Sequence, residues 1–391
     1  MKKTILIILT VFILIFCACS DPILHLVSNE IEIKEPLISG SPTNFAALKG
    51  KIYVAGGQLI NEKKKEYSHR LFEYTPGDGK WDTHDPNGII ISLAASNDYL
   101  YAIFDINGTG VLKRTNDLKT WIQVGDKENA QAVYFVNNHI FLCVKNINDY
   151  FYEIFYSGES SMILNEVGIT MANTAFLNGV IFDGANYYIC TNGGIYITSD
   201  PGVEPKIISG AVKTDYEDFF MGIIKVENAI ASIARNGKLF EISSDAISEI
   251  ASLNSGENIR FQVTSALAAY KNNKGSFLLF GIQDSAPSAS SGFTYGYMEI
   301  KYNTQITEGI AWSLSGAIAG NQLSKPGSAG SLIDEASDTY DSTIGVNPIH
   351  DLFQAPDGIL FASTQKNGVW SYREREDGNG GKTWQWNSEQ K

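Results

Sequence analysis

Arginine is the side chain best suited to hold a carboxylate, because its planar guanidinium donates two parallel hydrogen bonds. An enzyme that acts on acidic sugars would need several arginines converging where the first strands of its repeats begin. The repeats described below place none there. The chain has six arginines, at 70, 114, 235, 260, 373 and 375. Arg70, Arg114 and Arg373 fall on third strands, Arg235 at a strand end and Arg375 in a turn. We therefore expect no catalytic residue and no enzyme activity.

Two cysteines and five histidines are the other candidates for catalytic or metal chemistry. Cys143 and Cys190 fall at matching positions of two second strands, which predicts small, buried, unpaired thiols. The histidines, at 25, 69, 84, 139 and 350, show no zinc-ligand spacing. Neither a Gly-x-Ser-x-Gly elbow nor a phosphate-binding glycine loop occurs. The sequence predicts no cofactor and no metal site.

An acidic segment at 334–341 is the one place where oxygen ligands gather. It contains four carboxylates, among them Asp334 and Asp341, and Ca²⁺ is bound in proteins by six to eight oxygens. The segment lacks the alternating Asp-x-Asp-x-Asp-Gly pattern of a calcium loop. A solvated acidic loop is the favoured interpretation, and calcium binding stays open.

The first twenty residues have the order of a secretory signal. Lys2 and Lys3 precede an apolar run at 5–16, which is shorter than the about 20 residues that span a bilayer. The run ends on Ala18 and Cys19. This segment resembles a bacterial lipoprotein signal, with Phe16 at a position where spirochaete-like signals are looser. An ordinary cleaved signal and an uncleaved anchor are the alternatives.

The resemblance implies cleavage after residue 18 and acylation (palmitate) of Cys19, which would hold the chain in the cell envelope, facing the periplasm or the cell surface. Removal of two lysines leaves 28 Lys and Arg against 43 Asp and Glu, a net charge of −15. Nucleic-acid binding relies on clustered basic residues, so no nucleic-acid partner is expected. The expected membrane contact is the lipid anchor.

A sevenfold repeat dominates the rest of the chain. Short apolar runs follow Asn-, Asp- or Gly-containing turns, and the first six start 40 to 48 residues apart. The seventh starts 83 residues after the sixth. The seven runs are 52–55, 100–103, 140–143, 187–190, 230–233, 277–280 and 360–363.

This period is typical of β-propeller blades. The sequence predicts an all-β, seven-bladed β-propeller of four-stranded antiparallel blades across 41–391, and a β-sandwich is the alternative. Blades are expected to start near 44, 91, 132, 174, 219, 262 and 349. Residues 19–40 would form a tether with one strand at 28–34.

Two family resemblances accompany the repeat. The first blade resembles a kelch blade, with Gly56 and Gly57 after the second strand, then Tyr74 and Trp81. The turns at 116–121 and 379–384 are similar to the Asp-box turns of sialidase-type propellers. Both resemblances imply the fold and carry no chemistry.

Three connections are longer than their counterparts: 58–69, 283–293 and 315–348. Strand parity places all three on one face, over blades 6, 7 and 1. Long loops are often functional, although neutral surface padding is the alternative. The candidate binding residues on these loops are Lys63, Lys64, Tyr67, Phe293, Tyr295, Asp334 and Tyr340.

These observations together predict a non-catalytic envelope lipoprotein whose propeller binds an envelope protein or a glycan. A carbohydrate-active propeller enzyme and an adhesin for host matrix are the alternatives.

Overall fold

The computed structural model describes residues 36–61, 64–147, 151–169, 176–244, 246–252, 261–272, 275–284, 295–303, 311–314, 348–365, 367–376 and 381–389. The chain divides into two units, Pro36–Glu389 and a second formed by Met1–Glu35 with Gln390–Lys391. All described strands belong to the first unit. The expected signal peptide, Cys19 and the strand at 28–34 lie outside the described residues.

The first three blades are antiparallel sheets of four strands that follow one another in sequence. Blade 1 contains β1 (Ala46–Leu48), β2 (Lys51–Asn61), β3 (Glu66–Thr75) and β4 (Lys80–His84). Blade 2 contains β5 (Ile89–Ala95), β6 (Leu100–Ile106), β7 (Thr109–Thr115) and β8 (Ile122–Glu128). Blade 3 contains β9 (Ala130–Val136), β10 (His139–Lys145), β11 (Tyr152–Gly158) and β12 (Asn165–Glu166).

Four further blades repeat the pattern. Blade 4 contains β13 (Leu177–Phe182), β14 (Tyr187–Thr191), β15 (Gly194–Thr198) and β16 (Lys206–Val212), and the 3₁₀ helix η1 (Tyr216–Asp218) follows it. Blade 5 contains β17 (Phe220–Val226), β18 (Ala229–Ala234), β19 (Lys238–Ile242) and β20 (Ile247–Ser252). Blade 6 contains β21 (Phe261–Asn272), β22 (Gly275–Asp284), β23 (Tyr295–Asn303) and β24 (Ala311–Leu314). Blade 7 contains β25 (Ile349–Gln354), β26 (Leu360–Thr364), β27 (Val369–Glu376) and β28 (Lys382–Ser388).

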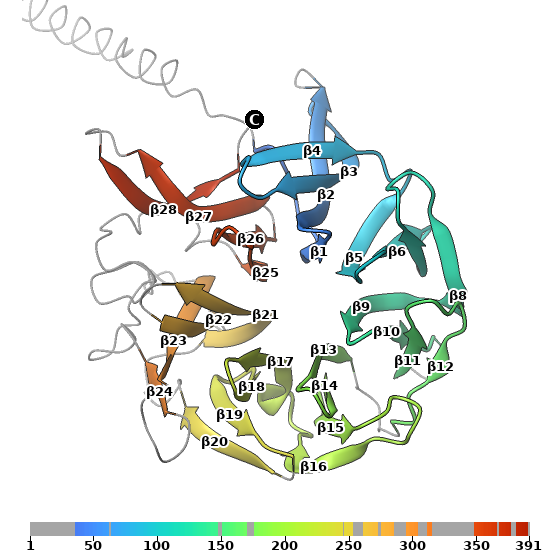
Figure 1. The fold of residues 1–391 in the computed structure, drawn as a ribbon, viewed down its shortest axis with the longest axis vertical. Coiled ribbons are helices and arrows are strands. Elements are labelled where there is room, and N and C mark those ends of the chain that lie inside the picture. The colour runs from blue at the N-terminus through green and yellow to red at the C-terminus, as the bar shows by residue number, and fades with distance from the viewer. Residues whose placement is uncertain are drawn as a thin grey trace, which may run out of the picture. The chain divides into compact units, whose positions relative to one another are not determined.

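The seven blades follow one another around a ring, with the first strand of each blade innermost (Figure 1). This confirms the predicted seven-bladed β-propeller. Second strands are buried along nearly their whole length, because each blade packs against neighbours on both faces; β14 and β26 are buried at every position. The innermost strands begin within three residues of each predicted blade start.

Among the described strands, none is shared between the first and last blades to close the ring, because every blade is continuous in sequence. The segment 37–40 closes the ring instead. Ser39 exchanges two backbone hydrogen bonds with Gly57 in blade 1, at 2.7 and 3.0 Å, and Gly40 accepts one from Gly368 in blade 7, at 3.1 Å. The ring is thus closed by the segment 37–40, which makes main-chain hydrogen bonds to blade 1 and to blade 7.

Glycine is required where this closing segment crosses the two blades. A Cβ atom on Gly56 would lie 2.7 Å from the Ile38 side chain, and one on Gly368 would lie 1.8 Å from the Ile38 carbonyl oxygen. Gly368 also has a φ of +73°. The glycine pair that suggested a kelch blade therefore has a local reason in this chain: it leaves room for the closing segment.

Polar side chains in or just before the innermost strands join each blade to the next. At six of the seven junctions one such side chain bonds to the main chain of the neighbouring inner strand. The pairs are Asn44 with Leu93, Ser92 with Val133, Tyr134 with Leu177, Asn178 with Phe220, Thr264 with Ile349, and Asp351 with Phe45. At the junction of blades 5 and 6 the Val263 amide donates to the Arg235 carbonyl, at 2.8 Å.

The predicted insertion at 58–69 is corrected by the structure. Residues 58–61 and 66–69 continue β2 and β3 as an extended hairpin rather than forming a loop. The antiparallel pairing of β2 with β3 continues through Leu59 and Tyr67 into this extension. A run of three lysines at its tip disguised the hairpin, because lysine is depleted in strands. The predicted loop 315–348 lies outside the described residues except for Pro348.

Candidate functional site

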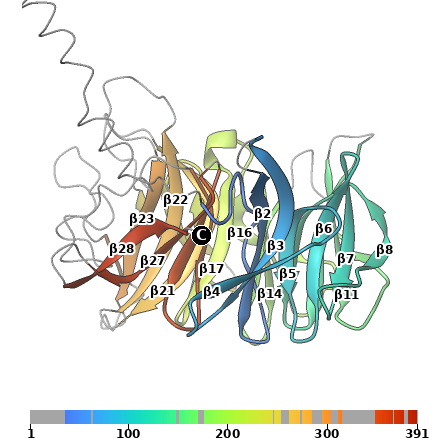
Figure 2. The same cartoon turned by 90° about the horizontal axis from the view of Figure 1, so that it is seen from above.

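One face of the propeller, which we call the link face, carries the links between blades and the turns from second to third strands. It follows from the antiparallel order that inner and third strands start at this face, whereas second and outer strands end there. Figure 2 shows the ring from the side, with the strands running between its two faces. Some of the polar contacts between blades lie near the same face: those of Asn178 with Phe220 and of Asp351 with Phe45 involve residues at or next to the starts of inner strands.

Exposed large apolar side chains gather on the link face. By strand position, eight of the thirteen such side chains that the structure describes lie there: Ile60, Tyr67, Ile89, Ile91, Ile106, Ile147, Val212 and Tyr216. The first six belong to blades 1, 2 and 3, and we call them the apolar arc. Contiguous exposed apolar groups mark interaction surfaces more often than scattered ones do.

The extended hairpin is fixed against blade 2, which brings two parts of the apolar arc together. The His69 Nε2 atom accepts a hydrogen bond from the Ile90 amide at 3.1 Å, and burial lowers the pKa of His69, which favours this neutral acceptor state. Arg70 forms an ion pair with Asp85 in the link to blade 2. The hairpin is therefore a fixed element.

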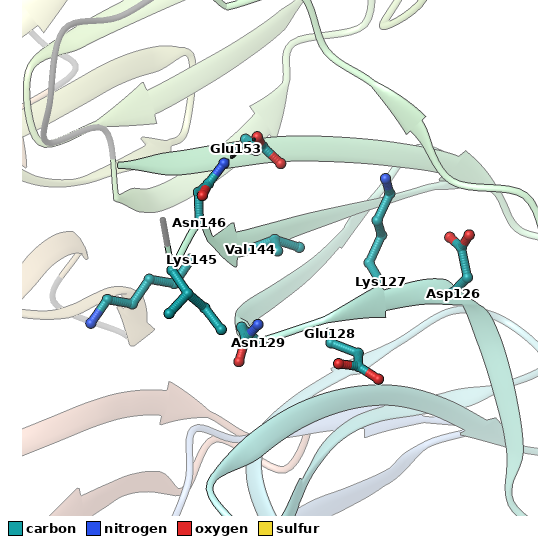
Figure 3. Close-up of a pocket in the computed structure, with 9 residues that line it drawn as sticks. Asp126, Lys127, Glu128, Asn129, Val144, Lys145, Asn146 and Glu153 are labelled. Atoms are coloured by element: carbon teal, nitrogen blue, oxygen red, sulfur yellow. Dashed lines mark hydrogen bonds between the residues drawn. The ribbon is translucent and has the colours of Figure 1, made fainter. Parts of the chain in front are cut away.

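A depression of about 370 Å³ adjoins the apolar arc at the junction of blades 2 and 3. Figure 3 shows its lining, which comes from the end of β8, the end of β10 and the start of β11. Charged side chains of both signs surround it, together with Val144 and the exposed Ile147. The charged lining residues are Asp126, Lys127, Glu128, Lys145 and Glu153.

Internal contacts hold part of this lining in place. The Lys127 ammonium lies 4.4 Å from the ring centre of Phe155. The Asn146 side-chain amide donates to Glu153 Oε1 at 3.0 Å, and both residues are labelled in Figure 3. Within the described residues, no group of three or more His, Cys, Asp or Glu side chains has the geometry to hold a metal ion. The depression can offer hydrogen bonds and charges of both signs to a ligand.

A second polar group lies on the link face where blades 5 and 6 meet. The Arg235 guanidinium stacks 4.2 Å from the ring centre of Tyr216, and its Nη1 atom donates to the Tyr216 hydroxyl and, at 3.2 Å, to Gln262 Oε1. The Gln283 amide donates to the same Gln262 oxygen at 3.3 Å. Tyr216 of η1 and Gln262 of β21 thus contact one arginine, and Gln283 of β22 supports Gln262.

The four arginines whose side chains the structure describes do not converge with one another, and Arg260 lies outside the described residues. Arg70, Arg114 and Arg373 lie on third strands as predicted, in blades 1, 2 and 7, and Arg235 follows the end of β18. Arg375 lies in β27 rather than in the expected turn. Arg373 pairs with the buried Glu389 at 2.7 Å, and Arg114 donates to the Glu159 carbonyl.

An ionised cluster lies inside blade 1, away from the link face. Glu73 is buried and accepts hydrogen bonds from Lys51 and Tyr53, and it contacts His84 at 3.1 Å. Burial opposes its ionisation, but these partners outweigh burial and hold the pKa of Glu73 below its usual range. The cluster pairs its charges internally, which fits a structural role.

The thiols are buried and free. Cys143 in β10 and Cys190 in β14 have no exposed surface, and burial raises the pKa of each to about 12. A thiol of this kind remains protonated and unreactive at neutral pH.

Three of the predicted binding residues are described, and the local structure of two of them differs from the expectation. Lys64 lies in the turn of the extended hairpin, Tyr67 is an exposed residue of β3, and Tyr295 begins β23, where it pairs with Gln283. Tyr67 and Tyr295 are thus strand residues and not loop residues. Lys63, Phe293, Asp334 and Tyr340 lie outside the described residues.

Sequence reasoning missed the apolar arc and the Arg235 group. Isoleucines at strand ends look like core residues, and nothing in the sequence pairs Gln262 with Arg235.

No helix in the described part of the chain is long and apolar enough to cross a bilayer.

No family model matches the chain, and no curated protein matches it. Solved β-propellers are similar in fold, at 10 to 12% identity. The WD40 β-propeller domain of Doa1 aligns with a TM-score of 0.50 over 87% of this chain and 95% of that domain. The extracellular domain of a hybrid two-component system from B. thetaiotaomicron aligns at 0.50, covering 88% of this chain and 40% of that one.

The GH74 enzyme of Niastella koreensis aligns with a TM-score of 0.51, over 92% of this chain and 56% of the enzyme. This chain therefore spans about half the length of two of these three structures. These neighbours support the class of protein that the seven described sheets define, a seven-bladed β-propeller. At this identity the similarity says nothing about activity.

Proposed function

We propose that the protein is a non-catalytic lipoprotein of the cell envelope, whose propeller binds an envelope protein or glycan through the link face. The observation that carries the proposal is the apolar arc. Exposed isoleucines on three consecutive blades, beside a mixed-charge depression, match the apolar centre and polar rim of protein interfaces.

The anchoring part of the proposal rests on the sequence around Cys19. A net charge of −15 after cleavage supports contact with the membrane through acyl chains rather than through basic patches. The binding part rests on surface chemistry, so the two parts can be tested separately.

Capture from detergent-solubilised envelope by the tagged mature chain tests the binding part. We expect a captured partner to be lost when Ile60 and Tyr67, which are 52% and 51% exposed, are both replaced by serine. Ile163→Ser is the matched control, because Ile163 is 69% exposed and lies in the β11–β12 connection on the opposite face.

Burying one large apolar side chain contributes about 1.5–3 kcal/mol, so the double change should weaken capture by more than tenfold. Equal capture by all three proteins would show that the apolar arc does not bind the partner. A loss caused by Ile163→Ser alone would place binding on the opposite face.

A further inference from the structure

One histidine attaches the extended hairpin of blade 1 to blade 2. The Nε2 atom of His69 in β3 accepts a hydrogen bond from the Ile90 amide in β5 at 3.1 Å. His69 lies on the same face of β3 as Tyr67, because side chains two positions apart share one face of a strand. The bond therefore fixes the strand that carries Tyr67 relative to the exposed Ile89 and Ile91 of blade 2.

Only a neutral imidazole can make this bond. A main-chain amide can donate but not accept, so Nε2 must carry its lone pair and the ring proton must lie on Nδ1. A protonated ring has an N–H group on both nitrogens, and two donors would then face each other across the contact. Protonation of His69 therefore removes the bond and puts a repulsion in its place.

The charges around His69 are paired elsewhere. Arg70 pairs with Asp85, Glu73 binds Lys51, and Asp105 accepts a hydrogen bond from the Gly108 amide at 2.6 Å. Within the described residues no carboxylate forms an ion pair with His69, and burial alone lowers its pKa. The segment 37–40 and β5 carry no charge, and the charged residues of the other elements packed around His69 are Lys51 in β2, Glu66, Arg70 and Glu73 in β3, Lys80, Asp82 and His84 in β4, Asp85 in the link and Asp105 in β6.

Acid favours a released hairpin, in which the contact of His69 with Ile90 is broken. The released imidazole has the ordinary pKa of 6.5, whereas the attached imidazole has a lower pKa. Protons therefore shift the equilibrium toward release as the pH falls below 6.5. The ion pair of Arg70 with Asp85 persists at pH 5, because the Asn87 amide and Arg70 hold the pKa of Asp85 below its ordinary 3.8.

We propose that His69 is a pH switch for the link face: its protonation releases the hairpin that carries Ile60 and Tyr67 and so weakens binding through the apolar arc. The inference rests on the proposed function, because it adds regulation to the same surface. Loss of one hydrogen bond changes an equilibrium constant by about two- to tenfold, so the response is graded rather than all-or-none.

A distance measurement by pulsed EPR tests the release without any partner. Spin labels would be attached to the mature chain in detergent at Lys64→Cys in the hairpin turn and at Asn107→Cys in the β6–β7 turn, which are both exposed positions. Cys143 and Cys190 are buried and should not take up label. We expect a narrow distance distribution at pH 7.5 and a broader one at pH 5.

Three variants of the labelled chain separate titration from other effects of acid. His69→Gln retains a neutral acceptor and cannot titrate, so its distribution should be narrow at both pH values. His69→Ala should give a broad distribution at both. His139→Gln is the matched control, since His139 begins β10 on the opposite face, and it should broaden at pH 5 like the wild type.

Three results would overturn the inference. They are a wild-type distribution that is equally narrow at both pH values, a His69→Gln distribution that broadens at pH 5 as the wild type does, and a narrow distribution in His69→Ala.

Capture from the detergent-solubilised envelope at both pH values tests the connection to binding. The wild type should capture the partner that depends on Ile60 and Tyr67 about fivefold less at pH 5 than at pH 7.5, and His69→Gln should capture it equally at both. Equal capture by the wild type at both pH values would overturn the regulatory role. The EPR measurement needs no partner, so a failed switch is distinguishable from a failed proposed function, in which capture would survive the double serine change.

Discussion

Replacing Asp351 with asparagine should stabilise the propeller above neutral pH and have little effect in acid. Asp351 lies near the start of the innermost strand of blade 7, and its Oδ2 accepts a hydrogen bond from the Phe45 amide of blade 1 at 2.8 Å. Burial raises the pKa of this carboxyl from 3.8 to about 7, although the hydrogen bonds from the main chain oppose the rise. The group at the ring junction is therefore costly to ionise.

The sign follows from proton binding. Between about pH 4 and pH 7 the folded chain holds a proton on Asp351 that the unfolded chain has released, so the contribution of Asp351 to stability is full below pH 4 and is lost as the pH rises to about 7. A pKa raised by about three units changes the free energy of unfolding by at most about 4 kcal/mol, at 1.36 kcal/mol per unit. Solvent near the inner strands lowers this, and we expect about 2–4 kcal/mol.

Asparagine keeps the acceptor for the Phe45 amide and cannot ionise. Urea unfolding of the wild type and of Asp351→Asn at pH 5 and pH 8 measures the effect, since every other group titrates in both proteins. The stability difference in favour of the variant should grow from pH 5 to pH 8. A difference that is the same at both pH values would refute the assignment of a raised pKa to this carboxyl.

Three further predictions concern the anchor, the thiols and the ring closure. Cys19→Ala should remove the mature protein from the detergent phase in phase partitioning; partitioning like the wild type would refute acylation. Cys143 and Cys190 should resist alkylation at pH 8 in the native protein, because burial raises the pKa of each thiol to about 12. Both should react after denaturation without reductant, and finding one disulfide per chain would contradict this. Gly368→Ala should lower the free energy of unfolding by more than about 2 kcal/mol, because the added Cβ would meet the Ile38 main chain. Gly77→Ala, with φ of +84° and open space around it, should lower it by only about 1 kcal/mol. Equal losses would contradict the role of Gly368 in ring closure.

The sequence contained enough information to predict the ring. Seven apolar runs at a regular spacing predict blades because a single four-stranded sheet cannot bury both of its faces alone. The predicted blade starts agree with the structure because each second strand follows a recognisable turn, and the first strand of the blade directly precedes that turn. The sequence does not indicate the hairpin at 58–69, because Lys63, Lys64 and Lys65 look like a solvated loop and the contact of His69 with Ile90 joins residues 21 positions apart.

The contacts that join the blades could not be predicted in the same way. Residues as different as Asn44, Tyr134 and Asp351 perform one task, bonding to the main chain of the next inner strand, so no motif marks them. The Arg235 group likewise joins residues 27 and 21 positions apart, from three elements. A search for an arginine triad cannot detect a single arginine supported by two glutamines.

Site-specific photo-cross-linking in intact cells tests most directly the claim that the link face is the binding surface. A photoreactive amino acid would replace, one at a time, Tyr67 and Ile147 on the link face and Ile163 on the opposite face. All three side chains are exposed, so each position tolerates the change and reports on its own surroundings. We predict one discrete adduct shared by positions 67 and 147 and none at 163. An adduct at 163 with none at 67 or 147 would contradict the proposal.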